Sequence, residues 1–110
     1  MLIHCVFCTI RPDANRGELA AVYDVFAGLV PVIDGMISFD AGPNRDFELK
    51  SPQFTDGFVV RFASRAAHLA YDGHPLHKAA GARLIGLCAG GYAGITVFDL
   101  EVQGTSDDQP

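Results

Sequence analysis

The chain places its hydrophobic residues with two different periods. Four stretches are rich in β-branched and aromatic residues and alternate loosely between apolar and polar positions, which predicts strands over residues 2–10, 36–42, 54–62 and 92–102. Two other stretches repeat apolar residues at steps of three and four, which predicts helices over residues 15–30 and 64–89. The predicted order is therefore strand, helix, strand, strand, helix, strand.

Polar and glycine residues mark the predicted helix ends. Asp13 or Asn15 can cap the first helix, and Ser64 can cap the second. The second helix is expected to break at Asp72-Gly73 and to restart with Pro75 at its first position, where a missing N–H costs nothing. Gly90-Gly91 is expected to supply a left-handed cap at its end.

This order of elements is the split βαβ pattern, which predicts an α+β, ferredoxin-like βαββαβ sandwich. Its four-stranded antiparallel sheet would carry both helices on one face. A single domain is expected over residues 1–102, followed by a polar tail, 103–110, that is expected to be disordered. The polar segment 43–53 has no clear period, and a connection of this length is typically mobile or functional.

The sheet face away from the helices is also predicted to be apolar. It would carry Phe7, Val59 and one of two alternative rows of the last strand, the Ile95 row or the Phe98 row. A large bare apolar face indicates an association site, and the simplest way to cover it is a homodimer with the two sheets packed face to face. Arg61 on this face would form an interface salt bridge or bind an anionic ligand.

Composition and charge exclude several classes of partner. The chain has 110 residues, 49% of them hydrophobic, and a net charge of -5, which argues against nucleic-acid binding. No apolar run approaches the roughly 20 residues of a membrane span. The N-terminus has no basic region or cleavage site, so no signal peptide is expected.

The three cysteines favour reduced thiols in a cytoplasmic protein, because their number is odd and no secretory signal accompanies them. Cys5 and Cys8 have the CxxC spacing of redox and zinc sites. However, residues three apart in a strand point to opposite faces, so the two thiols are not expected to share a metal or a disulfide.

The candidate chemistry gathers in residues 64–78 and in the first strand. His4 and His77 could act as general base and acid on an enolisable carbonyl, with the Tyr71 hydroxyl as donor to the developing enolate. Structural roles remain the alternative: His74 as a helix cap, His77 bonded to a backbone carbonyl, and His4 as a satisfied core histidine.

No metal site and no cofactor are predicted. A site built from His4, His74 and His77 would need a further ligand from Cys8 or Asp56, and none of these residues has a recognised metal-binding context.

Several motifs resemble the stress-responsive dimeric α/β-barrel domain family across nearly the whole chain. They are His4 in the opening strand, residues 62–64 before the second helix, the segment Tyr71-Asp72-Gly73-His74-Pro75-Leu76-His77, and the closing residues 97–100. The resemblance implies a ferredoxin-like protomer and a dimeric barrel. Plant members are linked to stress responses, one branch comprises polyketide cyclases, and the wider superfamily includes cofactor-free monooxygenases that act on polycyclic phenols.

In the cyclase branch the pocket lies between helices and sheet, and the motif match implies His4, His77 and Tyr71 as catalytic residues. Phe26 stands where that branch has a tyrosine, and Asp56 stands where it has a histidine. The candidate ligand-binding residues are Phe26, Asp56, Phe58 and His74.

Two hypotheses of different class follow. The first is a cofactor-free, polyketide-cyclase-like enzyme that transforms a small hydrophobic keto or phenolic compound. The second is a non-catalytic dimeric module that binds a small ligand or acts in a stress-related assembly. An apolar cavity of roughly 300 Å³ or more, with both imidazoles pointing into it, would favour the first.

Overall fold

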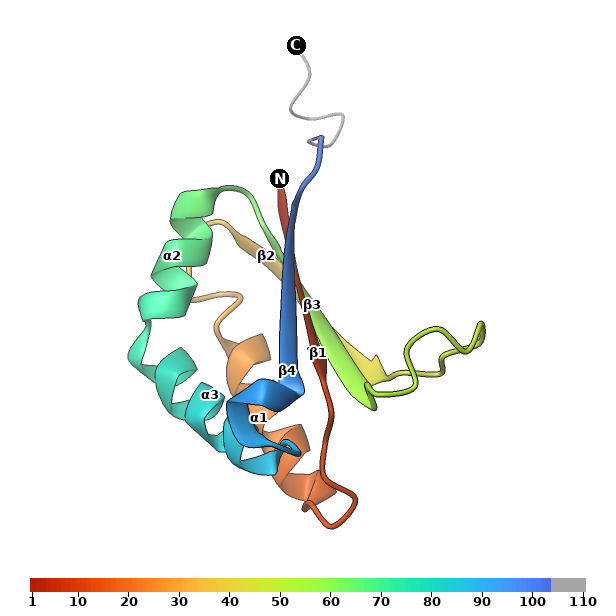
Figure 1. Ribbon diagram of the computed structural model, residues 1–110. Helices are drawn as coiled ribbons and strands as arrows, with labels where there is room; N and C mark the ends of the chain where they lie inside the picture. Colours follow the sequence, from red (N-terminus) through yellow and green to blue (C-terminus); the bar gives the residue numbers. More distant parts are fainter. Residues whose placement is uncertain (104–110) are drawn as a thin grey trace.

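The computed structural model describes residues 1–103, and the expected disorder of the tail beyond Gln103 lies outside the described residues. Four strands form one antiparallel sheet in the order β2-β3-β1-β4, with all the α-helices on one face (Figure 1). The elements are β1 (Leu2–Cys8), α1 (Arg16–Gly28), β2 (Met36–Pro43), β3 (Asp56–Phe62), α2 (Arg65–Gly73), α3 (Pro75–Leu87), a 3-10 helix (Gly91–Gly94) and β4 (Ile95–Glu101). The predicted ferredoxin-like fold is confirmed.

Strand register decides which residues face the helices. His4 pairs with Val60 of β3 and with Asp99 of β4, and all three side chains lie on the helix side of the sheet. Cys5 pairs with Phe98, so the Phe98 row lies on the other face and settles the alternative left open by the sequence. We call this other side, away from the helices, the open face.

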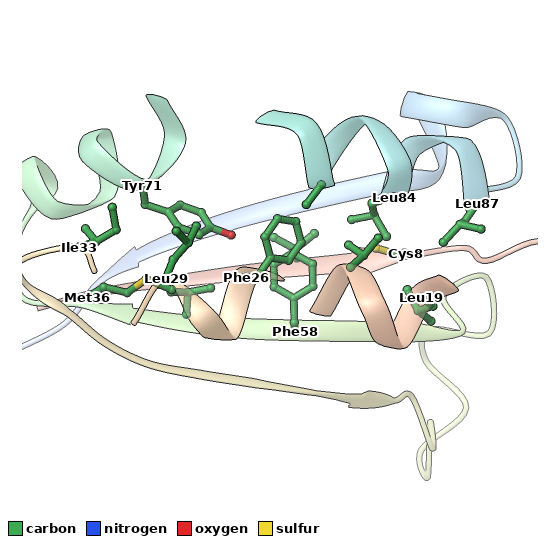
Figure 2. Close-up of a cluster of buried hydrophobic side chains, with 14 of the residues drawn as sticks. Cys8, Leu19, Phe26, Leu29, Ile33, Met36, Phe58, Tyr71, Leu84 and Leu87 are labelled. Atoms are coloured by element: carbon green, nitrogen blue, oxygen red, sulfur yellow. The ribbon is translucent and has the colours of Figure 1, made fainter. Parts of the chain in front are cut away.

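The core lies between the sheet and the helices. Phe26, Phe62 and Tyr71 are fully buried there, and Phe26 stacks on Phe58 with ring centroids 5.3 Å apart (Figure 2). Apolar residues from α1, α3 and the strands fill the rest of this layer, and they include Leu19, Leu29, Leu84 and Leu87. The predicted apolar stripe of the first helix is therefore buried. The stripe predicted for the second helix is buried only in part, because Leu76 at the start of α3 is 54% exposed.

The predicted helix starts are correct. Asn15 accepts hydrogen bonds from the backbone N–H groups of Gly17 and Glu18, and Ser64 accepts one from Ala67. No helix of the described residues is long and apolar enough to cross a membrane.

The end of α3 and the start of β4 differ from the prediction. The helix ends at Leu87 with Cys88 in extended conformation, and the left-handed Gly90 begins the 3-10 helix instead of capping α3. The segment is held by β1, because Thr9 donates to Gly94 and accepts from Ala89. A side chain at Gly94 would come within 2.3 Å of the Ala89 carbonyl oxygen. β4 therefore starts at Ile95, after this close approach, and not at residue 92.

The connection between β2 and β3 projects from the sheet on the side opposite the helices (Figure 1). Asp46 organises it by accepting hydrogen bonds from the backbone N–H groups of Lys50 and Ser51, which lower the pKa of its carboxyl group. The Phe47 side chain at its tip is 90% exposed. This segment, which the sequence left without a regular element, is an ordered arm with an apolar end.

Candidate acid-base site

Three histidines and a tyrosine lie together where helices α2 and α3 cover the sheet. They are His4, His68, His77 and Tyr71. The Tyr71 ring is 4.3 Å from the His77 ring and 6.1 Å from the His4 ring, centroid to centroid. The His4 ring is 4.9 Å from that of His68 on α2. The three residues implied as catalytic, His4, Tyr71 and His77, thus form one row, although they come from β1, α2 and α3.

His4 is held by a carboxylate on the neighbouring strand. Its Nδ1 lies 2.6 Å from Oδ1 of Asp99, and the His4 side chain is buried. A carboxylate only accepts hydrogen bonds, so Nδ1 carries the proton and the Nε2 of neutral His4 keeps its lone pair. Asp99 thereby fixes the tautomer and the orientation of the His4 ring, an arrangement that suits a general base.

His77 is also fixed through one ring nitrogen. Its Nδ1 lies 3.1 Å from the backbone carbonyl oxygen of Asp72, and a carbonyl only accepts, so Nδ1–H is the donor. Burial lowers the pKa of His77 below its ordinary value, against the opposing effect of the Asp72 carboxylate. The ring is therefore neutral at pH 7, with a basic Nε2. The structural role weighed for His77, a bond to a backbone carbonyl, is thus real, and it is compatible with catalysis.

The lowered pKa of His77 predicts how stability depends on pH. As the pH falls through about 6.5, the unfolded chain takes up a proton at His77 before the folded protein does, so the folded state loses stability. We expect the urea midpoint to drop between pH 7.5 and 5.5, and to drop less in His77→Gln. Equal pH slopes for the two proteins would show that His77 does not titrate in this way.

Tyr71 presents an unpaired hydroxyl to the core. Its side chain is 1% exposed, and its hydroxyl oxygen has no hydrogen-bond partner among the described residues. Burial raises the pKa of this phenol, so it stays protonated and acts as a donor. Figure 2 shows the hydroxyl pointing along the core toward Phe26. A buried donor without an acceptor is costly, and a ligand oxygen or an ordered water would satisfy it.

Phe26 and Phe58 form the apolar wall beside this row. The Phe26 ring lies 5.5 Å from the ring of His77 and 6.1 Å from that of Tyr71. Phe58 is stacked beneath Phe26. Both residues therefore stand where an apolar ligand that reaches Tyr71 would pack.

Asp56 and His74 have partners of their own. Both carboxylate oxygens of buried Asp56 lie 2.8 Å from Nη1 of Arg16. Asp56 pairs with Cys8 of β1, four residues after His4, so this ion pair lies apart from the histidines. His74 caps α3 by accepting from the backbone N–H of Leu76, as the structural alternative for this residue proposed.

Three side chains of this region were not predicted from the sequence: Asp99, Arg16 and His68. His68 is buried and its Nδ1 lies 2.8 Å from Nη1 of Arg65. Burial, and then the nearby His4, lower the pKa of His68. One signal was available, since His68 and Tyr71 are three residues apart and share a helix face.

A cavity of about 510 Å³ lies on the open face, opposite the histidines. Its apolar lining includes Phe7, Phe54 and Phe98, and one wall is formed by residues 40–44, at the end of β2 and directly after it. The cavity has the size of a small-molecule site, but its lining contains no histidine.

Residues 2–102 match the family model described as the stress responsive A/B barrel domain. The chain belongs to this family. Membership confirms the resemblance carried by His4, the Tyr71–His77 motif and the closing strand. No curated protein matches the chain.

Several solved structures resemble the chain. A dimeric ferredoxin-like protein of unknown function from Jannaschia sp. CCS1 is 39% identical, with a TM-score of 0.88 over 92% of this chain and 98% of that one. At3g17210 from Arabidopsis thaliana is 21% identical (TM-score 0.78, 96% and 99% covered). A hydroxynitrile lyase from Passiflora edulis is 16% identical (TM-score 0.76, 94% of each chain). The last two likenesses concern the fold alone.

Proposed function

We propose that the protein is a cofactor-free enzyme that transforms a small hydrophobic keto or phenolic compound by acid-base chemistry, in the manner of the polyketide cyclases. One observation carries the proposal. Among the described residues, the Tyr71 hydroxyl is a buried donor without a partner, and it lies beside the His77 imidazole, whose Nδ1 is bonded to the Asp72 carbonyl oxygen. The hydroxynitrile lyase from Passiflora edulis shows that the same fold carries an active site in another protein.

The proposed reaction starts with a carbonyl oxygen of the ligand accepting a hydrogen bond from Tyr71. Nε2 of His77 then removes a proton from the adjacent carbon. The C–H electron pair moves into the enolate, whose oxygen Tyr71 stabilises. The imidazolium of His77 later returns the proton. His4, aligned by Asp99 and with its ring 6.1 Å from that of Tyr71, is proposed as the second base.

The first test is ligand binding measured by thermal unfolding. Aromatic polyketides, quinols and fatty-acyl mimics are screened against the wild type, Tyr71→Phe and His77→Gln. A compound that raises the midpoint of the wild type, but much less that of Tyr71→Phe, would place its oxygen at the free hydroxyl. Equal shifts in the wild type and Tyr71→Phe for every binder would remove Tyr71 from the site.

The second candidate is a non-catalytic dimeric module that binds a small ligand or acts in a stress-related assembly. The observation that favours it is the position of the 510 Å³ cavity, which lies on the open face and away from the histidines. This candidate predicts that ligand shifts depend on Phe7 and Phe98 and not on Tyr71. The same panel, run on Phe98→Ser, separates the two candidates.

We further infer that the protein is a homodimer joined through the open face. Phe98 and Leu100 lie there and are about half exposed in the single chain, and Arg61 is exposed beside them. The 39% identical protein from Jannaschia is dimeric. The three free thiols support a cytoplasmic location, where cysteines stay reduced.

We expect Phe98→Asp to convert the dimer to a monomer at micromolar concentration, because a carboxylate would be buried without a partner in the apolar interface. Sedimentation velocity measures the change. Val32→Asp is the matched control, since Val32 is similarly exposed but lies in the segment between α1 and β2. A wild type that sediments as a monomer would contradict the dimer.

A further inference from the structure

His4, His68 and Asp99 bring their ligand atoms together at one place. A nitrogen from each imidazole and an oxygen from the carboxylate all lie within 4.8 Å of one another. They come from β1, α2 and β4, three elements that only the folded sheet and helical layer bring together. The acid-base proposal gives roles to His4 and Asp99 but none to His68, so the meeting of all three side chains is still unexplained.

We propose that His4, His68 and Asp99 bind one divalent transition-metal ion, with Zn²⁺ as the best fit. Imidazole and carboxylate are ligands that this class of ion prefers, and two histidines with one carboxylate leave a coordination position open for water or a small anion. Zn²⁺ holds such ligands at about 2.0–2.2 Å. Ligand atoms within 4.8 Å of one another therefore need only small side-chain rotations to meet around one ion.

The surroundings of the three residues favour binding of one ion. His4 and His68 are buried, so their rings are held in place before an ion arrives. The His4 and His68 rings lie 4.9 Å apart, centroid to centroid, so one ion can reach both imidazoles. The Asp99 side chain is 39% exposed on the edge strand β4, and it gives the ion a route from solvent.

Arg65 opposes metal binding. Its guanidinium donates to Nδ1 of His68 at 2.8 Å, and its positive charge repels a dication. Arg65 itself is exposed, so its side chain can move into solvent when an ion binds. The proposal therefore predicts the direction of an effect: removing the Arg65 side chain should increase the affinity for the metal ion.

The metal proposal does not rest on the acid-base proposal, although the two share His4. An ion at this site would occupy His4 and Asp99 and leave Tyr71 and His77 unchanged. Metal binding is read without any substrate, so its failure would leave the acid-base proposal standing, and the reverse also holds.

The experiment is a titration of the metal-free full chain with Co²⁺, followed by visible absorption, with Zn²⁺ competition. We expect one equivalent to bind and to be displaced by Zn²⁺. His68→Leu and Asp99→Asn should each weaken binding tenfold or more, and Arg65→Ala should strengthen it severalfold. The matched control is His74→Asn, which removes an imidazole outside the site and keeps a good capping residue.

Three results would overturn the proposal. They are no binding by the wild type at 1 mM Co²⁺, affinity unchanged in Asp99→Asn, and strong thiolate charge-transfer absorption that assigns the ion to cysteine. Circular dichroism checks that each variant folds. If His68→Leu does not fold, the test rests on two variants at exposed positions. Asp99→Asn should weaken Co²⁺ binding, and Arg65→Ala should strengthen it.

Discussion

Replacing Phe26 with alanine is expected to lower the free energy of unfolding by about 3–5 kcal/mol. Phe26 is 1% exposed, and its ring packs against Phe58, Tyr71 and His77 at once. Its removal leaves a void where α1 meets both α3 and the sheet. For a domain of this size the melting temperature should fall by roughly 12 °C or more, as measured by calorimetry.

The same substitution at Phe47 is the control, because that ring lies at the exposed tip of the β2–β3 arm. Phe47→Ala is expected to change stability by no more than about 0.5 kcal/mol. If Phe26→Ala cost less than about 1 kcal/mol, the region around Tyr71 and His77 would not be tightly packed. A site that opens easily to a ligand would then be the better description.

Replacing His77 with glutamine is expected to lower kcat by a factor of about 10²–10⁴ on any compound that the protein turns over. The amide keeps a donor near the Asp72 carbonyl but supplies no base. KM should change by a much smaller factor than kcat, and the melting temperature should stay close to that of the wild type. Steady-state kinetics on a compound found by the thermal screen would measure the effect.

His74→Asn tests whether the loss belongs to His77. Asparagine keeps the cap of α3 while removing an imidazole three residues from His77. We expect it to retain nearly full activity. If His74→Asn and His77→Gln reduced kcat equally, the geometry of the α2–α3 junction would matter, and neither imidazole would be the base.

Much of the fold could be predicted because local and long-range signals agree. Alternation along residues 2–10 and 54–62 already separated a helix side from an open face, and Asn15, Ser64 and Pro75 marked helix starts by their chemistry. The end of α3 was wrong for a physical reason. Gly90 and Gly91 have the left-handed backbone conformation that was expected. However, the hydrogen bonds of Thr9 to residues 89 and 94 hold this segment against β1, so the two glycines start the 3-10 helix and do not cap α3.

The site was only partly predictable for a related reason. His4, Tyr71 and His77 could be named from the motif and the strand pattern. Asp99 and Arg16 could not, because each acquires its role from a partner 95 or 40 residues away. Whether Asp99 meets His4 depends on the pairing of β4 with β1, and shifting that register by one residue would turn Asp99 to the open face.

The positions of the three cysteines allow alkylation to measure the rates of two processes, dissociation of the proposed dimer and local unfolding of the protomer. Cys5 lies on the open face, whereas Cys8 and Cys88 are buried on the helix side, and burial raises the pKa of Cys8 to about 12. Only a thiolate reacts quickly with iodoacetamide. Modification of Cys5 alone would therefore report separation of the two sheets in the proposed dimer, and modification of all three sulfurs would report the lifting of α3 from β1. Mass spectrometry of a single time course would give both rates from the natural sequence.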